Sequence, residues 1–233
     1  SVLDNVKKII LLGITGSIGS STLRLLRKKK HKFDLVGISV NKNIGSLSDI
    51  IHEFNVKYVA INDVEAAKNF KSSAKILYGK QGLIDLTSIN CDLVVSGINL
   101  GENLGADLTI SGTVGAAWEA ASFGIPSMAI SLETDLSNHT ADPSNIDFTG
   151  AMYFTLMFAE KLLHMEPVDD VHLLNINVPQ NANNNTDWRI TRQSKKQYFV
   201  PANLDNPELH QYKKADNHDM SELNSDIYAV VND

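Results

Sequence analysis

The residues best suited to chemistry lie in a polar, glycine-rich stretch, CDLVVSGINLGENLGADLTISGTVGAA, at positions 91–117. Its start, Leu93-Val94-Val95, is typical of a strand buried on both faces of a parallel sheet. The glycines and asparagines that follow predict a loop whose backbone amides can approach a ligand closely. Ser111-Gly112-Thr113 then precede a predicted helix at 114–123, and hydroxyls with unpaired N–H groups at a helix start suit a phosphate. The stretch therefore predicts an anion site; the alternative is a structural loop with an N-capped helix.

A second glycine-rich turn follows the first predicted strand. Lys8 to Leu12 is an apolar strand pattern that runs directly into GITGSIG at 13–19, and a helical pattern comes next. Strand, glycine turn and helix form the setting in which such a motif binds a dinucleotide. Gly13 would make the tight turn, Gly16 would let the backbone approach a pyrophosphate, and Gly19 would permit close helix packing.

The residues after the second predicted strand, Phe33 to Val40, indicate which dinucleotide would bind. An NAD site usually carries an acid there for the ribose hydroxyls, whereas this chain has Asn41-Lys42-Asn43. A cation flanked by amides suits a 2′-phosphate, so the pattern favours NADP over NAD. The alternative interpretation is an ordinary turn that happens to contain Asn and Lys.

Strand and helix patterns alternate along most of the chain, which predicts a Rossmann-like, doubly wound α/β sheet of six to eight mostly parallel strands in three layers. We expect one domain over 1–180, with halves 1–90 and 91–180, followed by a C-terminal arm over 181–233. In the arm, Trp188 to Thr191 and Gln197 to Val200 alternate as the strands of a β-hairpin would.

Composition excludes several classes of protein. The net charge of −6 over 233 residues is mild and spread out, so no nucleic-acid footprint is visible. No apolar run reaches membrane-spanning length, and the N-terminal residues do not form a signal peptide. The single cysteine, Cys91, rules out an internal disulfide and suits a reducing compartment. It precedes a buried strand, so we expect a packed small hydrophobe rather than a nucleophile, in a cytoplasmic protein.

The stretch VSGINLGENLGADLTISGTVGAAWEA closely resembles the signature of the SurE (survival protein E) nucleoside monophosphate phosphatases. The resemblance covers roughly Asp92 to the end and continues through GIPSMAISL (124–132), LLNINVP (173–179), WRITRQS (188–194) and DIYAVVND (226–233). It implies that Asn99 is a ligand of a divalent metal, Mg or Mn, and that Ser111, Gly112 and Thr113 hold the phosphate. It also implies a homo-oligomer, a dimer or tetramer, because the family's arm reaches other subunits.

The N-terminal half resembles a different family. KKIILLGITGSIGSSTLRLLRKKKHKFDLVGISVNKNIGSLSDIIHEFNVKYVAINDVEAAK is similar to the NADPH-binding start of deoxyxylulose-phosphate reductoisomerase, and the likeness runs on through GKQGLIDL (79–86) to about Val95. That family usually has Gly where Asn41 stands. The resemblance implies NADPH contacts at Thr15, Gly16, Ser17, Ile18, Asn41, Lys42 and Asn43.

The two resemblances meet at CDLVVSG, which suggests a recombined, natural or engineered, chain joined near residues 90–95. The phosphatase pattern should begin with a strand ending in Asn-Asp-Asp-Gly, whose paired carboxylates hold the metal, but Ile14 and Thr15 stand there instead. A neutral amide at Asn99 cannot hold Mg²⁺ alone, and Asp107 offers no assured charge. The reductoisomerase pattern, for its part, should continue into a metal-binding catalytic domain that is not found here.

Three functions compete on these grounds. The first is a SurE-type phosphomonoesterase scaffold whose catalysis is impaired because the aspartate pair is missing. The second is an NADP(H)-binding module without its catalytic domain. The third is an engineered chimera without activity. In the first two, the partner is a nucleotide or another small molecule that bears phosphate.

Overall fold

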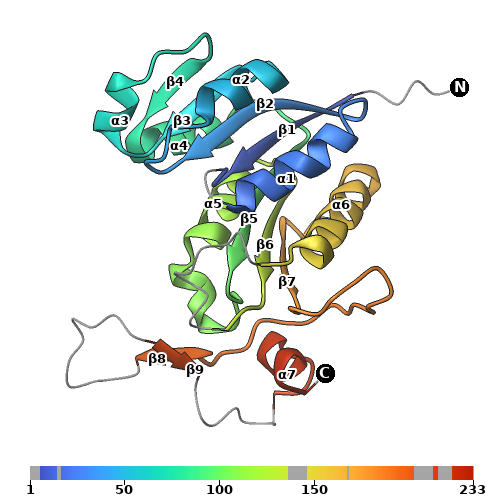
Figure 1. Cartoon of the computed structure of the whole chain (residues 1–233). Coiled ribbons are helices and arrows are strands. Elements are labelled where there is room, and N and C mark those ends of the chain that lie inside the picture. The colour runs from blue at the N-terminus through green and yellow to red at the C-terminus, as the bar shows by residue number, and fades with distance from the viewer. Residues whose placement is uncertain are drawn as a thin grey trace, which may run out of the picture.

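The computed structural model describes residues 6–14, 17–135, 146–166, 168–201, 212–214 and 222–232, with residues 17–21, 201 and 212 described by their backbone alone. Seven parallel strands form one sheet in the order β4-β3-β2-β1-β5-β6-β7 (Figure 1). The predicted Rossmann-like, doubly wound α/β sheet is thus confirmed. Its strands are β1 (Lys7–Leu12), β2 (Phe33–Val40), β3 (Tyr58–Ile61), β4 (Lys75–Tyr78), β5 (Leu93–Leu100), β6 (Ser127–Leu132) and β7 (Leu173–Val178).

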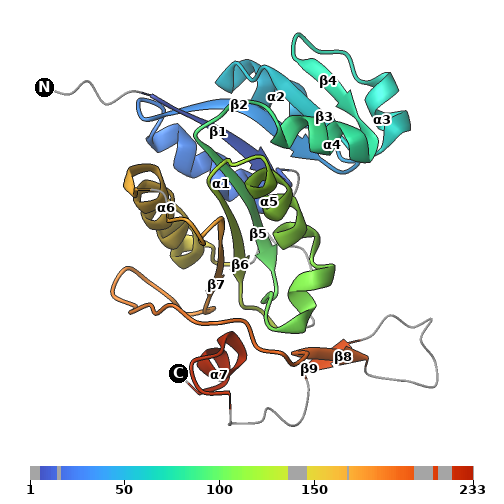
Figure 2. The same ribbon diagram turned by 180° about the vertical axis from the view of Figure 1, so that it is seen from behind.

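Helices cover both faces of this sheet, which gives the predicted three layers. Figures 1 and 2 show α1 and α6 on one face, with α4 and α5 on the opposite face. Among the described residues, no helix is long and apolar enough to cross a membrane. The helices are α1 (Ser17–Lys28), α2 (Leu47–Phe54), α3 (Val64–Asn69), α4 (Gly79–Thr87), the 3₁₀ helix η1 (Ala106–Ile110), α5 (Gly112–Ser122), α6 (Thr149–His164) and α7 (Asp226–Asn232).

Strand β1 shows why an apolar run forms a central strand. Ile9 and Leu11 belong to the hydrophobic core under α1 and α6, whereas Ile10 and Leu12 belong to the core under α4 and α5. Because successive side chains of a strand point to opposite faces, a run without polar residues fits only a strand that is covered on both sides.

Strand β5 is longer than the sequence predicts. The residues Gly97 to Leu100, predicted as the start of a loop, extend the strand, because Asn99 pairs with Ser131 and Leu100 with Leu132 of β6. The pairing is irregular between Ser96 and Asn99. An added Cβ at Gly97 would lie 2.4 Å from the carbonyl oxygen of Ile130, and its φ of +116° also requires glycine.

The C-terminal arm packs beyond the carboxyl ends of β5, β6 and β7 (Figures 1 and 2). It contains an antiparallel ribbon, β8 (Phe199–Pro201) with β9 (Tyr212–Lys214), and the helix α7. The predicted β-hairpin is therefore present, and its second predicted strand, Gln197 to Val200, overlaps β8, but its first predicted strand is wrong. Trp188 to Thr191 forms no strand, because the partner of β8 comes from later in the chain.

Asp226, the first residue of α7, fastens the arm to the loop after β5. Its side chain is buried, and its residue is 7% exposed. Oδ2 accepts a hydrogen bond of 2.8 Å from the Gly105 amide, while Oδ1 accepts from the amides of Ser194 and Ile227, both at 2.8 Å. One carboxylate therefore satisfies buried amides from three segments of the chain.

We expect Asp226→Ala to lower the free energy of unfolding by about 2–4 kcal/mol, because it leaves buried amides without acceptors. Urea unfolding measures this change. Glu65→Ala is the matched control, because the exposed Glu65 carboxylate pairs with Lys68 on the surface and its loss should change stability by less than about 0.5 kcal/mol. Equal effects of the two substitutions would show that Asp226 does not hold the arm.

Candidate functional site

The candidate site lies where strands β1 and β5 run side by side at the middle of the sheet. Leu12 at the end of β1 pairs with Ser96, after which β1 turns away while β5 continues to Leu100. The strand order reverses direction at this pair, and open α/β sheets bind ligands at such a switch point, beyond the carboxyl ends of their strands.

The turn after β1 is fixed by strand β2. The Gly13 amide donates to the Ser39 hydroxyl and the Ile14 amide donates to the Ser39 carbonyl, each at 2.9 Å. Gly13 has a φ of +81°, a conformation that favours glycine, as the predicted tight turn requires. Ile14 is 3% exposed and belongs to the hydrophobic core. The position at which the SurE resemblance implies a metal-holding aspartate thus carries a buried apolar side chain.

The predicted NADPH contacts are only partly described by the structure. Thr15 and Gly16 lie outside the described residues, while Ser17 and Ile18 open helix α1 and are described by their backbone alone. Helix α1 begins directly beyond the carboxyl end of β1, as in the dinucleotide-binding arrangement.

The three residues after β2 have different surroundings. The Asn41 side chain accepts a hydrogen bond of 2.9 Å from the Asn62 amide group, and the Asn43 side chain accepts one of 3.1 Å from the Gly45 backbone. Lys42 is exposed and forms no ion pair with the described part of the chain. Both bonds use side-chain oxygens, so the NH₂ groups of Asn41 and Asn43 remain donors, and Lys42 is the cation of the three that a phosphate could meet.

Asn99 lies in the part of β5 that extends past β1. Its side-chain NH₂ donates to the carbonyls of Leu100 at 3.2 Å and Gly101 at 2.9 Å. These two bonds fix the orientation of the amide and leave its Oδ1 as the oxygen that a cation or a donor could use.

The predicted phosphate residues form the start of helix α5. The Ser111 hydroxyl accepts from the Val114 amide at 3.2 Å and so caps the helix. The same hydroxyl still has a proton to donate. Gly112 is exposed, and an added Cβ there would meet nothing within 4 Å, so the start of α5 is open to solvent on that side. This geometry suits an anion at a helix N-terminus.

The carboxylates near this loop are turned toward the C-terminal arm. Asp107 Oδ2 accepts from the amides of Tyr198 at 3.0 Å and Phe199 at 2.8 Å. Glu102, whose side chain is 1% exposed, accepts at Oε1 from the Tyr198 hydroxyl at 3.2 Å and the Lys214 ammonium at 3.0 Å. The roles of Glu102 and Asp226 escaped sequence reasoning, because their partners are distant in the chain.

The environment of this cluster shifts the pKa values of two side chains. Burial raises the pKa of the Tyr198 hydroxyl. Burial lowers the pKa of Lys214, but hydrogen bonds to Tyr198 and Glu102 outweigh it, and the net pKa lies above its ordinary value. Lys214 therefore stays protonated at neutral pH, with the Glu102 carboxyl group 3.0 Å from its ammonium.

The side chains that the structure describes at the switch point do not form the set of ligands that a divalent metal prefers. Within the described ranges, no group of three or more His, Cys, Asp or Glu side chains is arranged to hold an ion. Asn99 offers a neutral oxygen, Ile14 offers none, and Asp107 already accepts two backbone amides. Mg²⁺ and Mn²⁺ prefer sites with one or two carboxylates.

Cys91 is not a nucleophile in this arrangement. It is partly buried and packs against the core beneath α4 and α5, as the sequence predicts. Burial raises the pKa of its thiol to about 11, so the reactive thiolate is scarce at neutral pH.

The two halves of the chain are similar to different groups of known proteins. The family model described as Survival protein SurE matches residues 56–200. The 5′-nucleotidase SurE of Thermococcus gammatolerans is 40% identical over 136 residues, which cover 54% of this chain and 50% of that protein. The chain thus spans about half the length of the curated relatives that it matches.

A second group of relatives matches as well. The 1-deoxy-D-xylulose 5-phosphate reductoisomerase of Clostridium perfringens (strain SM101) is 43% identical over 101 residues, which cover 40% of this chain and 26% of that protein. Similarity to both groups confirms the chimera-like pattern predicted from the sequence.

Among solved structures, the SurE protein from Aquifex aeolicus has the same fold. It superposes with a TM-score of 0.60 at 22% identity and covers 97% of this chain and 89% of that chain. The match to the SurE family model begins at residue 56, before β5, the strand at which the resemblance read from the sequence starts. With more than half of its residues matched by that model, the chain belongs to the Survival protein SurE family.

Proposed function

We propose that this chain is a SurE-type nucleotide-binding scaffold whose metal-dependent phosphomonoesterase activity is impaired. The observation that carries the proposal is the buried Ile14 side chain at the end of β1, beside the strand that holds Asn99. The relatives named 5′-nucleotidase SurE support a nucleotide as the ligand. Asn99 would be one neutral metal ligand in an incomplete site.

Phosphate binding depends on different residues and is retained in this proposal. The amides of Gly112 and Thr113, the hydroxyls of Ser111 and Thr113, and the N-terminus of α5 would hold the anion. None of these groups requires the missing carboxylates, so binding and hydrolysis are separable properties of the chain.

A second candidate function is NADP(H) binding by residues 1–90, the predicted reductoisomerase-like half. The glycine turn after β1, the start of α1 and the exposed Lys42 support it. The predicted contacts at Thr15, Gly16, Ser17, Ile18, Asn41, Lys42 and Asn43 belong to this proposal. Residues 91–180 would then supply the rest of the common domain 1–180, and residues 181–233 would form the arm.

The oligomeric state and the location in the cell are also part of the proposal. A homo-oligomer, a dimer or tetramer, is proposed from the resemblance of the arm to family arms that reach other subunits. A cytoplasmic location is proposed because the single cysteine suits a reducing compartment.

The first test is hydrolysis of nucleoside monophosphates with and without Mn²⁺ or Mg²⁺. We expect the release of phosphate to rise little when metal is added, because the carboxylates that would hold the ion are missing at β1. The control is a chelator added to the same reaction, which should change the rate equally little. A strong metal-dependent rate that the chelator removes would contradict an impaired site.

We expect Thr113→Val to weaken the binding of inorganic phosphate about tenfold, because it removes a hydroxyl that donates to a charged ligand. Calorimetric titration measures the dissociation constant. Thr109→Val is the matched control, since the Thr109 hydroxyl donates to the Ala106 carbonyl inside η1. Unchanged phosphate affinity in the Thr113 variant would move the anion away from α5.

For the second candidate, Lys42→Ala should weaken the binding of NADPH about tenfold while leaving the weaker binding of NADH unchanged, because only NADPH carries the 2′-phosphate. Calorimetry with both nucleotides measures the two affinities. Lys71→Ala, a change at another exposed lysine, should affect neither. If both nucleotides lost affinity equally, Lys42 would not read the 2′-phosphate.

A further inference from the structure

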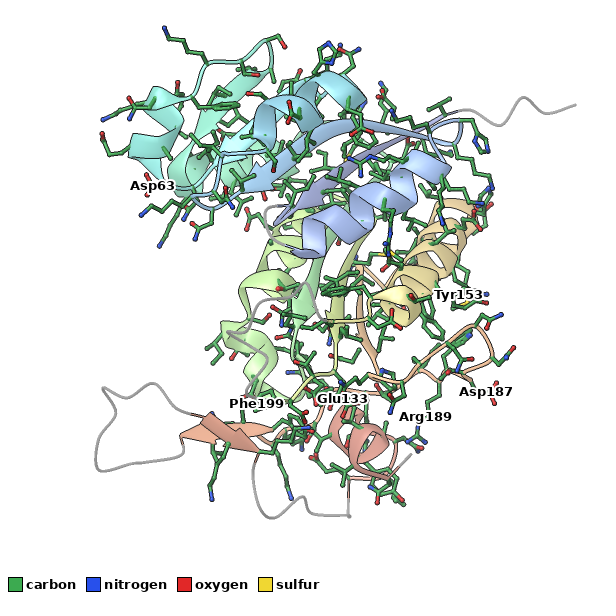
Figure 3. All side chains as sticks on the ribbon, viewed as in Figure 1. Asp63, Glu133, Tyr153, Asp187, Arg189 and Phe199 are labelled. Atoms are coloured by element: carbon green, nitrogen blue, oxygen red, sulfur yellow. The ribbon has the colours of Figure 1, made fainter. Side chains whose placement is uncertain are left out.

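A compact cluster of aromatic and charged side chains lies beyond the carboxyl ends of β5 and β6, separate from the start of α5. Tyr198 precedes β8 and Phe199 begins it, Lys214 ends β9, and Glu102 and Glu133 follow β5 and β6. Figure 3 shows Glu133 at the end of the sheet that faces the ribbon β8–β9, to which Phe199 belongs.

The geometry of this cluster is well defined. Phe199 pairs with Lys214 across the ribbon. The Lys214 ammonium lies 3.0 Å from Glu102 Oε1, 3.9 Å from Glu133 Oε1 and 5.2 Å above the centre of the Tyr198 ring. The rings of Tyr198 and Phe199 meet edge to face, with centroids 4.9 Å apart.

Asp107 connects this cluster to the phosphate residues. Its carboxylate holds the amides of Tyr198 and Phe199, and its own helix, η1, ends directly before Ser111. With a rise of about 2 Å per residue in a 3₁₀ helix, Asp107 lies roughly 8 Å from Ser111. Asp107 therefore ties the start of the ribbon to the segment that leads into the proposed phosphate residues.

The chemistry of the cluster matches that of a nucleobase. A base presents flat π faces, which stack on an aromatic ring whatever the base. Its edge carries both acceptors, which an ammonium can satisfy, and donors, which a carboxylate can accept. Phe199 is partly buried, and the side chains of Lys214 and Glu133 are 40% and 33% exposed, so these groups reach the surface together.

We propose that this cluster is the nucleoside subsite of the nucleotide-binding chain. The Phe199 ring stacks on the base, while Lys214 and Glu133 meet the polar edge of the base. The buried carboxylate of Glu102 acts through Lys214, since it holds the ammonium in place and does not touch the ligand. The subsite rests on the proposed phosphate site, which would bind the other end of the same nucleotide.

The test compares ligands that contain different parts of a nucleotide. Phe199→Leu keeps an apolar side chain against the cluster of Leu104 and Ile227 but removes the flat ring. We expect it to weaken the binding of AMP and of adenosine about tenfold, while the binding of ribose 5-phosphate stays unchanged. Phe199→Trp should restore both affinities. Phe123→Leu, a change at an exposed ring at the end of α5, is the matched control.

The outcomes separate the subsite from the phosphate site. Adenosine binding that Phe199→Leu does not weaken, or equal losses for AMP and ribose 5-phosphate, would overturn the subsite and leave Phe199 a packing residue. A wild-type chain that binds neither adenosine nor AMP would overturn it too. Adenosine binding that is weakened by Phe199→Leu, together with no binding of ribose 5-phosphate, would support the subsite and reject the phosphate site.

Discussion

The pairing of β1 with β5 is the constraint on which the rest of the structure depends. It joins strands from the two halves of the chain, and the direction of the strand order reverses at this pair. Asp92 strengthens the contact, since its amide donates to the Lys8 carbonyl at 2.8 Å and its carboxylate accepts from the Lys8 amide at 2.7 Å. The predicted join near residues 90–95 therefore lies at the start of β5, which is bonded to β1 through both backbone and side chain.

Packing across the two halves follows from this pairing. Leu86 of α4 and Ala120 of α5 belong to the same hydrophobic core, together with Ile10 and Val94 of the paired strands. Such a core asks only for apolar side chains of suitable volume at alternating positions, so halves that resemble different families can share it. A metal site asks for particular oxygen atoms at particular distances. Recombination can therefore preserve a fold and still remove some of the ligands of a metal site.

Sequence patterns predict the fold well because they record local burial. The apolar runs of β1 and β5 identify central strands, and the glycine turn after β1 predicts the start of α1. The extension of β5 to Leu100 was missed because polar, glycine-rich residues rarely form strands, and here pairing with β6 overrides that preference. One strand of the arm was mispredicted for a similar reason, since the partner of β8 is determined by distant contacts rather than by a local turn.

The candidate site is harder to read from the sequence, because the identity of an acid does not reveal its partner. Asp107, Glu102 and Asp226 all stand close to the glycine-rich loop, and each has its carboxylate turned toward the arm or toward loop amides. The hydrogen bonds of Asp226 and Asp107 tie the loop between β5 and α5 to the arm. In the proposed function, this order would support phosphate binding by the amides at the start of α5. Carboxylates that are engaged in this way are not available as ligands for a metal.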